Sequence, residues 1–175
     1  VIEKISGLSL DQYLQENIFT PLGLKDTSYP LDEKMPSPYA HGYTKQTLDG
    51  KEAEVTFNNP SWTNAAGQMV STFADLKIWA KALGTGALLS DNAFKERLSW
   101  VTLPPNTPKR KYGLGVGANN GWINHTGSLP GYNCVVAYLP EKQAVLVVMI
   151  NSDIDLVVKG KNVPLTDMVF EAVTK

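Results

Sequence analysis

The segment GWINHTGSLPGYNCVVAYLPEKQAVLVVMIN, from Gly121 to Asn151, has the clearest structural pattern in the sequence. It contains two apolar runs, Asn133 to Leu139 and Ala144 to Ile150, joined by the short polar turn Pro140-Glu141-Lys142-Gln143. Two such runs with a short turn between them predict an antiparallel hairpin. The second run is apolar at every position, which predicts a strand that is covered on both faces and central in its sheet.

The composition predicts a globular chain with a sizeable core. The chain has 175 residues, 43% of them hydrophobic, and a formal net charge of -1. This charge gives no support to binding of nucleic acid or of an anionic membrane surface. The short basic run Lys109-Arg110-Lys111 follows prolines and is expected in a solvated loop. A single cysteine, Cys134, excludes an internal disulfide and is expected to act as a small apolar residue in its strand.

Helices are expected before the hairpin and after it. Ser9, Ser71-Thr72 and Ser90 have the chemistry of helix N-caps, and apolar residues follow each with helical spacing. The expected helices cover residues 1–5 (the end of a helix), 10–20, 73–83, 91–98 and 163–173. The buried face of the third is expected to include Phe73, and Gly84 and Gly86 are expected to close it.

The remaining segments are expected to be strands or irregular structure. Residues 112–117 and 122–126 alternate like strands. Residues 25–60 are rich in proline and predict an irregular excursion with one hairpin near Asp49-Gly50. The order of elements predicts an α+β fold, an antiparallel sheet covered by helices. No stretch has the length of a transmembrane span, and no signal peptide is visible in a chain that begins at Val1.

A polar segment, His125-Thr126-Gly127-Ser128, lies just before the hairpin and is therefore held rigidly. Gly127 lacks a side chain, so a ligand could approach the backbone closely, and the N–H of Ser128 could act as an oxyanion donor. From these residues alone a second interpretation stays open, in which His125 is a structural histidine satisfied by backbone groups beside a turn.

The segment resembles the third conserved element, K-T-G or H-T-G, of the penicillin-interacting serine hydrolases: serine β-lactamases, DD-peptidases and related esterases. The His-Thr-Gly form is similar to the DD-carboxypeptidase and class C branch. Three further stretches resemble the family in the same order, namely SLDQYLQENIFTPLGLKDTSY, AAGQMVSTFADLKIWAKAL and KYGLGVG. The resemblance covers nearly all of residues 1–151 and implies the β-lactamase/DD-peptidase-like fold.

Two family motifs are absent from the sequence. No serine is followed by lysine three residues later, and no tyrosine is followed by asparagine two residues later. In the family both motifs lie upstream of the matching segment. We therefore expect residues 1–175 to be the C-terminal part of a longer β-lactamase-like domain, with an incomplete fold. The strand 144–150 would then have an unpaired edge where upstream strands belong.

The resemblance implies an acyl-enzyme mechanism in the parent protein. An upstream serine would attack a carbonyl group, and an upstream lysine and tyrosine would move its proton. His125 and Thr126 are the expected catalytic residues, with His125 in the place of the family's lysine. Gly127 and Ser128 are the expected substrate-binding residues, and the N–H of Ser128 would form half of the oxyanion hole. The family is often exported.

The motif Ser90-Asp91-Asn92 is expected to be a chance match without a catalytic role. It spells the second motif of class A β-lactamases, but it comes too late in the chain and precedes a helical pattern. We expect Ser90 to cap a helix, away from His125.

Other classes of site find no support in the sequence. There is no G-x-S-x-G elbow, and the histidines His41 and His125 lack the spacing of a metal motif. His41 is expected to be a loop residue. We expect no cofactor and no metal. The expected partners are a small-molecule or peptide substrate with a carbonyl centre, and the upstream segment of the same protein. A non-catalytic binding module with the same fold, and a purely structural role, remain alternatives.

Overall fold

The computed structural model describes residues 1–102 and 110–174. Its centre is a six-stranded antiparallel sheet in the order β3-β4-β5-β6-β7-β8. The strands are β3 (Val101–Thr102), β4 (Arg110–Tyr112), β5 (Gly117–Asn119), β6 (Trp122–Leu129), β7 (Tyr132–Leu139) and β8 (Ala144–Ile150). The predicted hairpin is β7–β8, and the α+β prediction is confirmed.

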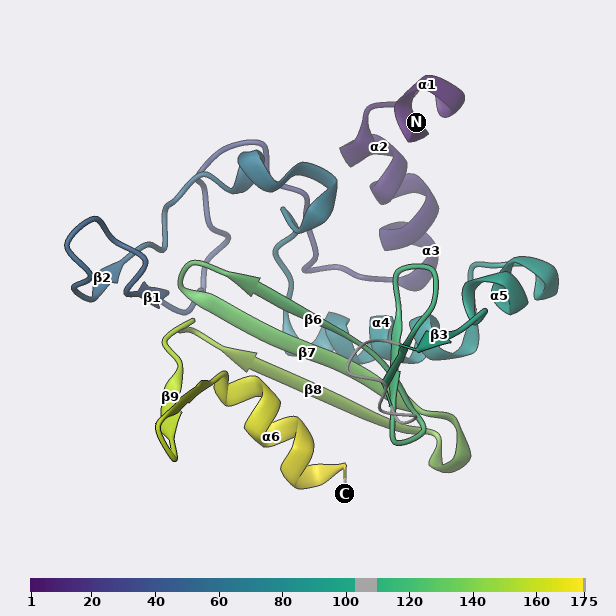
Figure 1. Cartoon of the computed structure of the whole chain (residues 1–175). Coiled ribbons are helices and arrows are strands. Elements are labelled where there is room, and N and C mark those ends of the chain that lie inside the picture. The colour runs from purple at the N-terminus through teal and green to yellow at the C-terminus, as the bar shows by residue number, and fades with distance from the viewer. Residues whose placement is uncertain (103–109, 175) are drawn as a thin grey trace.

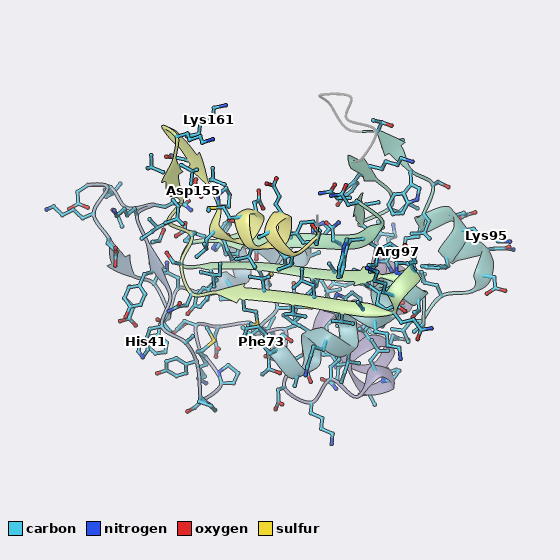
Figure 2. All side chains as sticks on the ribbon, turned by 90° about the horizontal axis from the view of Figure 1, so that it is seen from below. His41, Phe73, Lys95, Arg97, Asp155 and Lys161 are labelled. Atoms are coloured by element: carbon cyan, nitrogen blue, oxygen red, sulfur yellow. The ribbon has the colours of Figure 1, made fainter. Side chains whose placement is uncertain are left out.

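Helices cover the two faces of this sheet. Figures 1 and 2 show α4 (Phe73–Thr85) on one face and α6 (Leu165–Val173) on the other. Alternate residues of a strand point to opposite faces, so the strands contribute to two separate cores. On the α4 side, Ala80, Leu83, Val116, Ile123 and Val136 pack together. On the α6 side, the cluster consists of Trp122, Val135, Ala137 and Phe170.

The apolar run alone predicted a central position for β8, but the described residues instead show the unpaired edge that was expected for strand 144–150. β8 is the outermost strand of the sheet, and β7 is its only partner strand among the described residues. Both α4 and α6 contact β8. A helix on each face requires apolar residues at every position, whether or not another strand lies alongside, and this explains the uninterrupted apolar run.

The predicted single strand over residues 112–117 is also wrong. The chain forms β4, turns, and returns as β5, with the N–H of Gly113 bonded to the carbonyl of Val116 at 2.8 Å. Gly115 allows the turn because its φ is 70°. Of the basic run, Arg110 and Lys111 lie in β4 rather than in a loop, and Lys109 lies outside the described residues.

The N-terminal helices agree with the sequence pattern. They are α1 (Ile2–Ser6), α2 (Leu10–Leu14), a π-helical segment (Gln15–Phe19) and α3 (Thr20–Leu22). Gly23 ends α3 with a φ of 68°. The excursion that follows contains the predicted hairpin, made of β1 (Tyr43–Thr44) and β2 (Ala53–Glu54). A 3-10 segment (Pro60–Ala66) precedes α4.

The capping predictions for α4 and α5 are confirmed, with two corrections inside α4. Thr72 caps α4, and Ser90 caps α5 (Asp91–Arg97). Phe73 was expected on the buried face but is 54% exposed, whereas the residues of α4 that pack on the sheet core lie between Leu76 and Leu83. Gly84 was expected to close the helix but lies within it, and Gly86, with a φ of 70°, ends it.

A second hairpin separates the sheet from the last helix. It consists of β9 (Leu156–Val158) and β10 (Lys161–Val163), which the sequence pattern did not predict, and α6 therefore begins at Leu165 rather than 163. Figure 2 shows this hairpin, which carries Lys161, on the α6 side of the sheet. Within the described ranges, no helix is long and apolar enough to cross a membrane.

Candidate active site

The His-Thr-Gly segment lies in β6 between two tight turns. Asn120-Gly121 connects β5 to β6 with φ values of 49° and 84°, the pattern of a type I′ hairpin turn. Pro130-Gly131 connects β6 to β7, and Gly131 has a φ of 86°, as expected at the second central position of a type II turn. Both turns have two residues, so the register of β6 is fixed at each end.

The second half of β6 has a free edge. β5 pairs with Trp122, Ile123 and Asn124 only, whereas β7 pairs with β6 as far as Leu129. Beyond Asn124, β7 is therefore the only strand beside β6 in the part of the chain that the structure describes. The free edge begins at His125, the first residue of the predicted motif.

The two turns show which backbone groups face this edge. A two-residue hairpin turn closes on a hydrogen-bonded pair, so Trp122 directs its N–H and C=O toward β5 and Leu129 directs its own toward β7. These groups alternate along a strand. Both turns therefore give the same result: Thr126 and Ser128 direct their N–H and C=O groups away from β7, along the free edge.

The side chains of the segment divide between the two faces. His125 lies opposite Val136 on the α4 face, whereas Thr126 lies opposite Val135 on the α6 face. Ser128 shares the face of Thr126 by alternation. The side chains of His125, Thr126 and Ser128 are exposed, and Gly127 is half-buried.

The structure thus brings the four predicted residues together on one exposed strand segment. Thr126 and Ser128 also direct their backbone N–H and C=O groups toward the free edge. Two hollows on the surface lie elsewhere, one against Trp100 and Lys111 and the other between α2 and Tyr29. A concave site around His125 remains a prediction.

His125 makes two hydrogen bonds through its ring. Its Nδ1 lies 2.7 Å from the carbonyl oxygen of Thr126, and its Nε2 lies 2.9 Å from the hydroxyl of Tyr112. Sequence reasoning did not select Tyr112, although the residue is the second of the KYGLGVG stretch. The Asn120-Gly121 dipeptide predicts the β5–β6 hairpin, but no local signal connects Tyr112 of β4 to His125.

Gly127 is required by packing against the next strand. A Cβ at this position would lie 2.8 Å from Sγ of Cys134, the residue opposite it in β7. Burial raises the pKa of the Cys134 thiol, so the thiolate is disfavoured. Cys134 therefore acts as a packing residue, as predicted, and lacks the properties of a nucleophile.

The turn after the segment is held from outside the sheet. The carboxylate of Asp153 accepts a hydrogen bond from the N–H of Gly131 at 3.2 Å. A Cβ at Gly131 would lie 2.5 Å from Val55, so the excursion packs directly on this turn. Sequence reasoning missed Asp153, because nothing in its local pattern connects it to residue 131.

The second histidine forms a separate pair. Nδ1 of His41 lies 2.6 Å from Oε1 of Glu54, and both side chains are about half exposed. The hydrogen bond with His41, and then the one with Thr56, lowers the pKa of Glu54. His41 thus belongs to the excursion, as expected. Across residues 1–102 and 110–174, no group of three or more His, Cys, Asp or Glu side chains could hold a metal ion.

Ser90 is a helix cap. Its Oγ accepts a hydrogen bond from the N–H of Ala93 at 3.3 Å, which is the role that the sequence predicted.

Relatives of known structure share this fold over most of the chain. A D-stereospecific amidohydrolase from a Streptomyces species is 30% identical, with a TM-score of 0.81 over 87% of this chain and 46% of its own. D-amino acid amidase from Ochrobactrum anthropi SV3, solved with L-phenylalanine amide, is 28% identical, with a TM-score of 0.71 over 86% of this chain and 46% of its own.

A curated relative shows the same partial overlap. A beta-lactamase of Escherichia coli K12 is 26% identical over an alignment of 187 positions, gaps included, that covers 86% of this chain and 48% of the relative. The chain therefore spans less than half the length of each of these three relatives. The family model described as Beta-lactamase matches residues 1–163. With nearly the whole sequence matched, the chain belongs to the beta-lactamase family.

Proposed function

We propose that the chain is the part of a serine hydrolase that carries the His-Thr-Gly strand, and that the whole protein cleaves amide or ester bonds through an acyl-enzyme. The observation that carries this proposal is the free edge of β6, along which Thr126 and Ser128 direct their backbone groups. A substrate lying along this edge would form hydrogen bonds like those of an added strand.

Each residue of the segment has a role in this proposal. The N–H of Ser128 stabilises the oxyanion of the tetrahedral intermediate, and the hydroxyl of Thr126 binds a carboxylate or carbonyl of the substrate. Gly127 allows β6 to pack closely against Cys134 of β7. His125 takes part in the proton transfers of the reaction. The nucleophilic serine comes from outside these 175 residues, because none of their serines has a lysine three positions later.

The relatives indicate which substrates to test first. The Streptomyces neighbour is a D-stereospecific amidohydrolase, and the Ochrobactrum neighbour is a D-amino acid amidase. We propose amides of D-amino acids as the first substrate class, with activated esters and β-lactams as probes of the same chemistry.

The experiment compares the 175-residue chain with a form extended at its N-terminus to include a serine-x-x-lysine motif. We expect the extended form to hydrolyse a D-amino acid amide, an activated ester or nitrocefin, or to be labelled by a fluorescent penicillin. The short chain should do none of these, because no acyl-enzyme can form on it. Covalent labelling of the short chain at any serine would contradict the proposal.

Variants of the extended form test the site itself. Thr126→Val keeps the shape of the side chain but removes its hydroxyl, and we expect kcat/KM to fall by about tenfold to a hundredfold, the effect of one hydrogen bond to a charged group. Thr102→Val, at an exposed position of β3, is the matched control. Penicillin binding without turnover in the extended form would favour the non-catalytic binding module instead.

A further inference from the structure

Tyr112 reaches His125 around the end of the strand that lies between them. Tyr112 of β4 is opposite Gly117 of β5, and Gly117 is opposite Asn124 of β6. β5 begins at Gly117, so no residue of β5 lies beside His125. The two rings meet edge to face, with centroids 6.0 Å apart and planes inclined by 63°.

The two hydrogen bonds of His125 select one tautomer of its neutral ring. A carbonyl oxygen can only accept, so Nδ1 carries the proton and donates to Thr126. In the neutral ring Nε2 is then the acceptor, and the hydroxyl of Tyr112 donates to it at 2.9 Å. Without Tyr112, the lone pair on Nε2 would have no partner among the described protein groups.

This arrangement leaves neither ring nitrogen of His125 available to a substrate. The oxygen of Tyr112, by contrast, keeps lone pairs after donating its proton to Nε2. When His125 is protonated, Nε2–H donates to the tyrosine oxygen, and the phenolic O–H becomes free to donate elsewhere. The charge state of His125 therefore decides whether Tyr112 offers an acceptor or a donor at the edge of β6.

We propose that Tyr112 is a positioning residue of this site: it holds His125 in the Nδ1–H tautomer and converts the charge state of His125 into the hydrogen bonding of its own hydroxyl. The tautomer follows from the contacts in β4 and β6 alone. The consequence for catalysis rests on the proposed function.

The tautomer is measured by 15N NMR on the labelled 175-residue chain. The sequence has two histidines, so His41 is an internal reference for folding. We expect His125 to show a protonated Nδ1 and an unprotonated Nε2 in its neutral form. In Tyr112→Phe the ratio of Nδ1–H to Nε2–H should fall about fivefold, which corresponds to one net hydrogen bond.

A matched control removes a different tyrosine hydroxyl. Tyr132→Phe loses the hydrogen bond to the carbonyl of Ala40, at 2.8 Å, and should leave the tautomer of His125 unchanged. A second measurement needs no mutation: the 13Cζ shift of Tyr112 should differ between the neutral and the protonated ring of His125, to which its hydroxyl is bonded, and that of Tyr132 should not. The inference is overturned if His125 in the unaltered chain has its proton on Nε2, or if Tyr112→Phe leaves the ratio unchanged.

The role of Tyr112 in catalysis is tested separately, by measuring kcat. In an extended form that hydrolyses an ester, Tyr112→Phe should lower kcat by about fivefold, because the site loses one net hydrogen bond of the phenolic hydroxyl. A shifted tautomer with unchanged kcat would overturn the catalytic role of Tyr112. If no extended form hydrolyses any probe, the proposed function fails, while the tautomer measurement still decides the role of Tyr112 in holding His125.

Discussion

Asp153 holds the turn at Gly131 although 22 positions separate the two residues: its carboxylate lies 3.2 Å from the Gly131 N–H. The same carboxylate accepts hydrogen bonds from the hydroxyl of Thr44, at 3.0 Å, and from the side-chain amide of Gln46. One side chain after β8 therefore joins β1 to the β6–β7 turn, and so sets the far end of the candidate strand.

Asp153→Ala should destabilise the chain by about 1–3 kcal/mol, because the hydroxyl of Thr44, which is 1% exposed, loses the acceptor for its proton. The free energy of unfolding in urea measures this effect. Hydrogen exchange at Gly131 should also accelerate relative to Asp155→Ala, an exposed carboxylate in the same segment. Equal exchange rates in the two variants would show that Asp153 does not hold the turn.

Gly84→Ala should destabilise the chain, although alanine normally stabilises a helix interior by about 1 kcal/mol relative to glycine. A Cβ at Gly84 would lie 2.3 Å from the ring of Tyr138, which is buried in β7. The clash should cost about 1–3 kcal/mol. Thr85→Ala, at the exposed neighbouring position, should be neutral or slightly stabilising, and thermal unfolding distinguishes the two variants.

Cys134 should react slowly with Ellman's reagent in the native chain. Burial raises the pKa of its thiol, so at any given pH near neutrality the thiolate fraction is smaller than in the unfolded chain, and the rate should rise as the pH increases. Unfolding in guanidinium should restore the rate of a free cysteine. A native rate equal to the unfolded rate would show that the strand pairing at Gly127 is open.

Val145→Lys should reduce self-association of the chain. Val145 is 36% exposed in β8, whose outer edge has no partner strand in the described structure, and lysine on an edge strand opposes pairing with another chain. Light scattering over a concentration series measures the effect. Val157→Lys, at a more exposed valine of β9, is the control, and an equal reduction there would indicate a general charge effect rather than edge pairing.

Local patterns in the sequence determined the elements that depend on near neighbours. Ser90 and Thr72 could be recognised as caps because a cap bonds to a backbone group three residues away, and the β7–β8 hairpin could be recognised from its apolar runs and short turn. The His-Thr-Gly segment was found in the same way, as a polar interruption next to a hairpin and through the resemblance it carries.

Contacts between distant segments could not be predicted from such local patterns. The contact between Tyr112 and His125 and the support of Gly131 by Asp153 join segments whose separation in the chain carries no periodic signal. Hydrophobic alternation specifies which face of a strand is buried, but not which strand lies beside it. For this reason the sequence could locate the candidate site residues, whereas only the fold determined that Thr126 and Ser128 direct their backbone groups along a free edge.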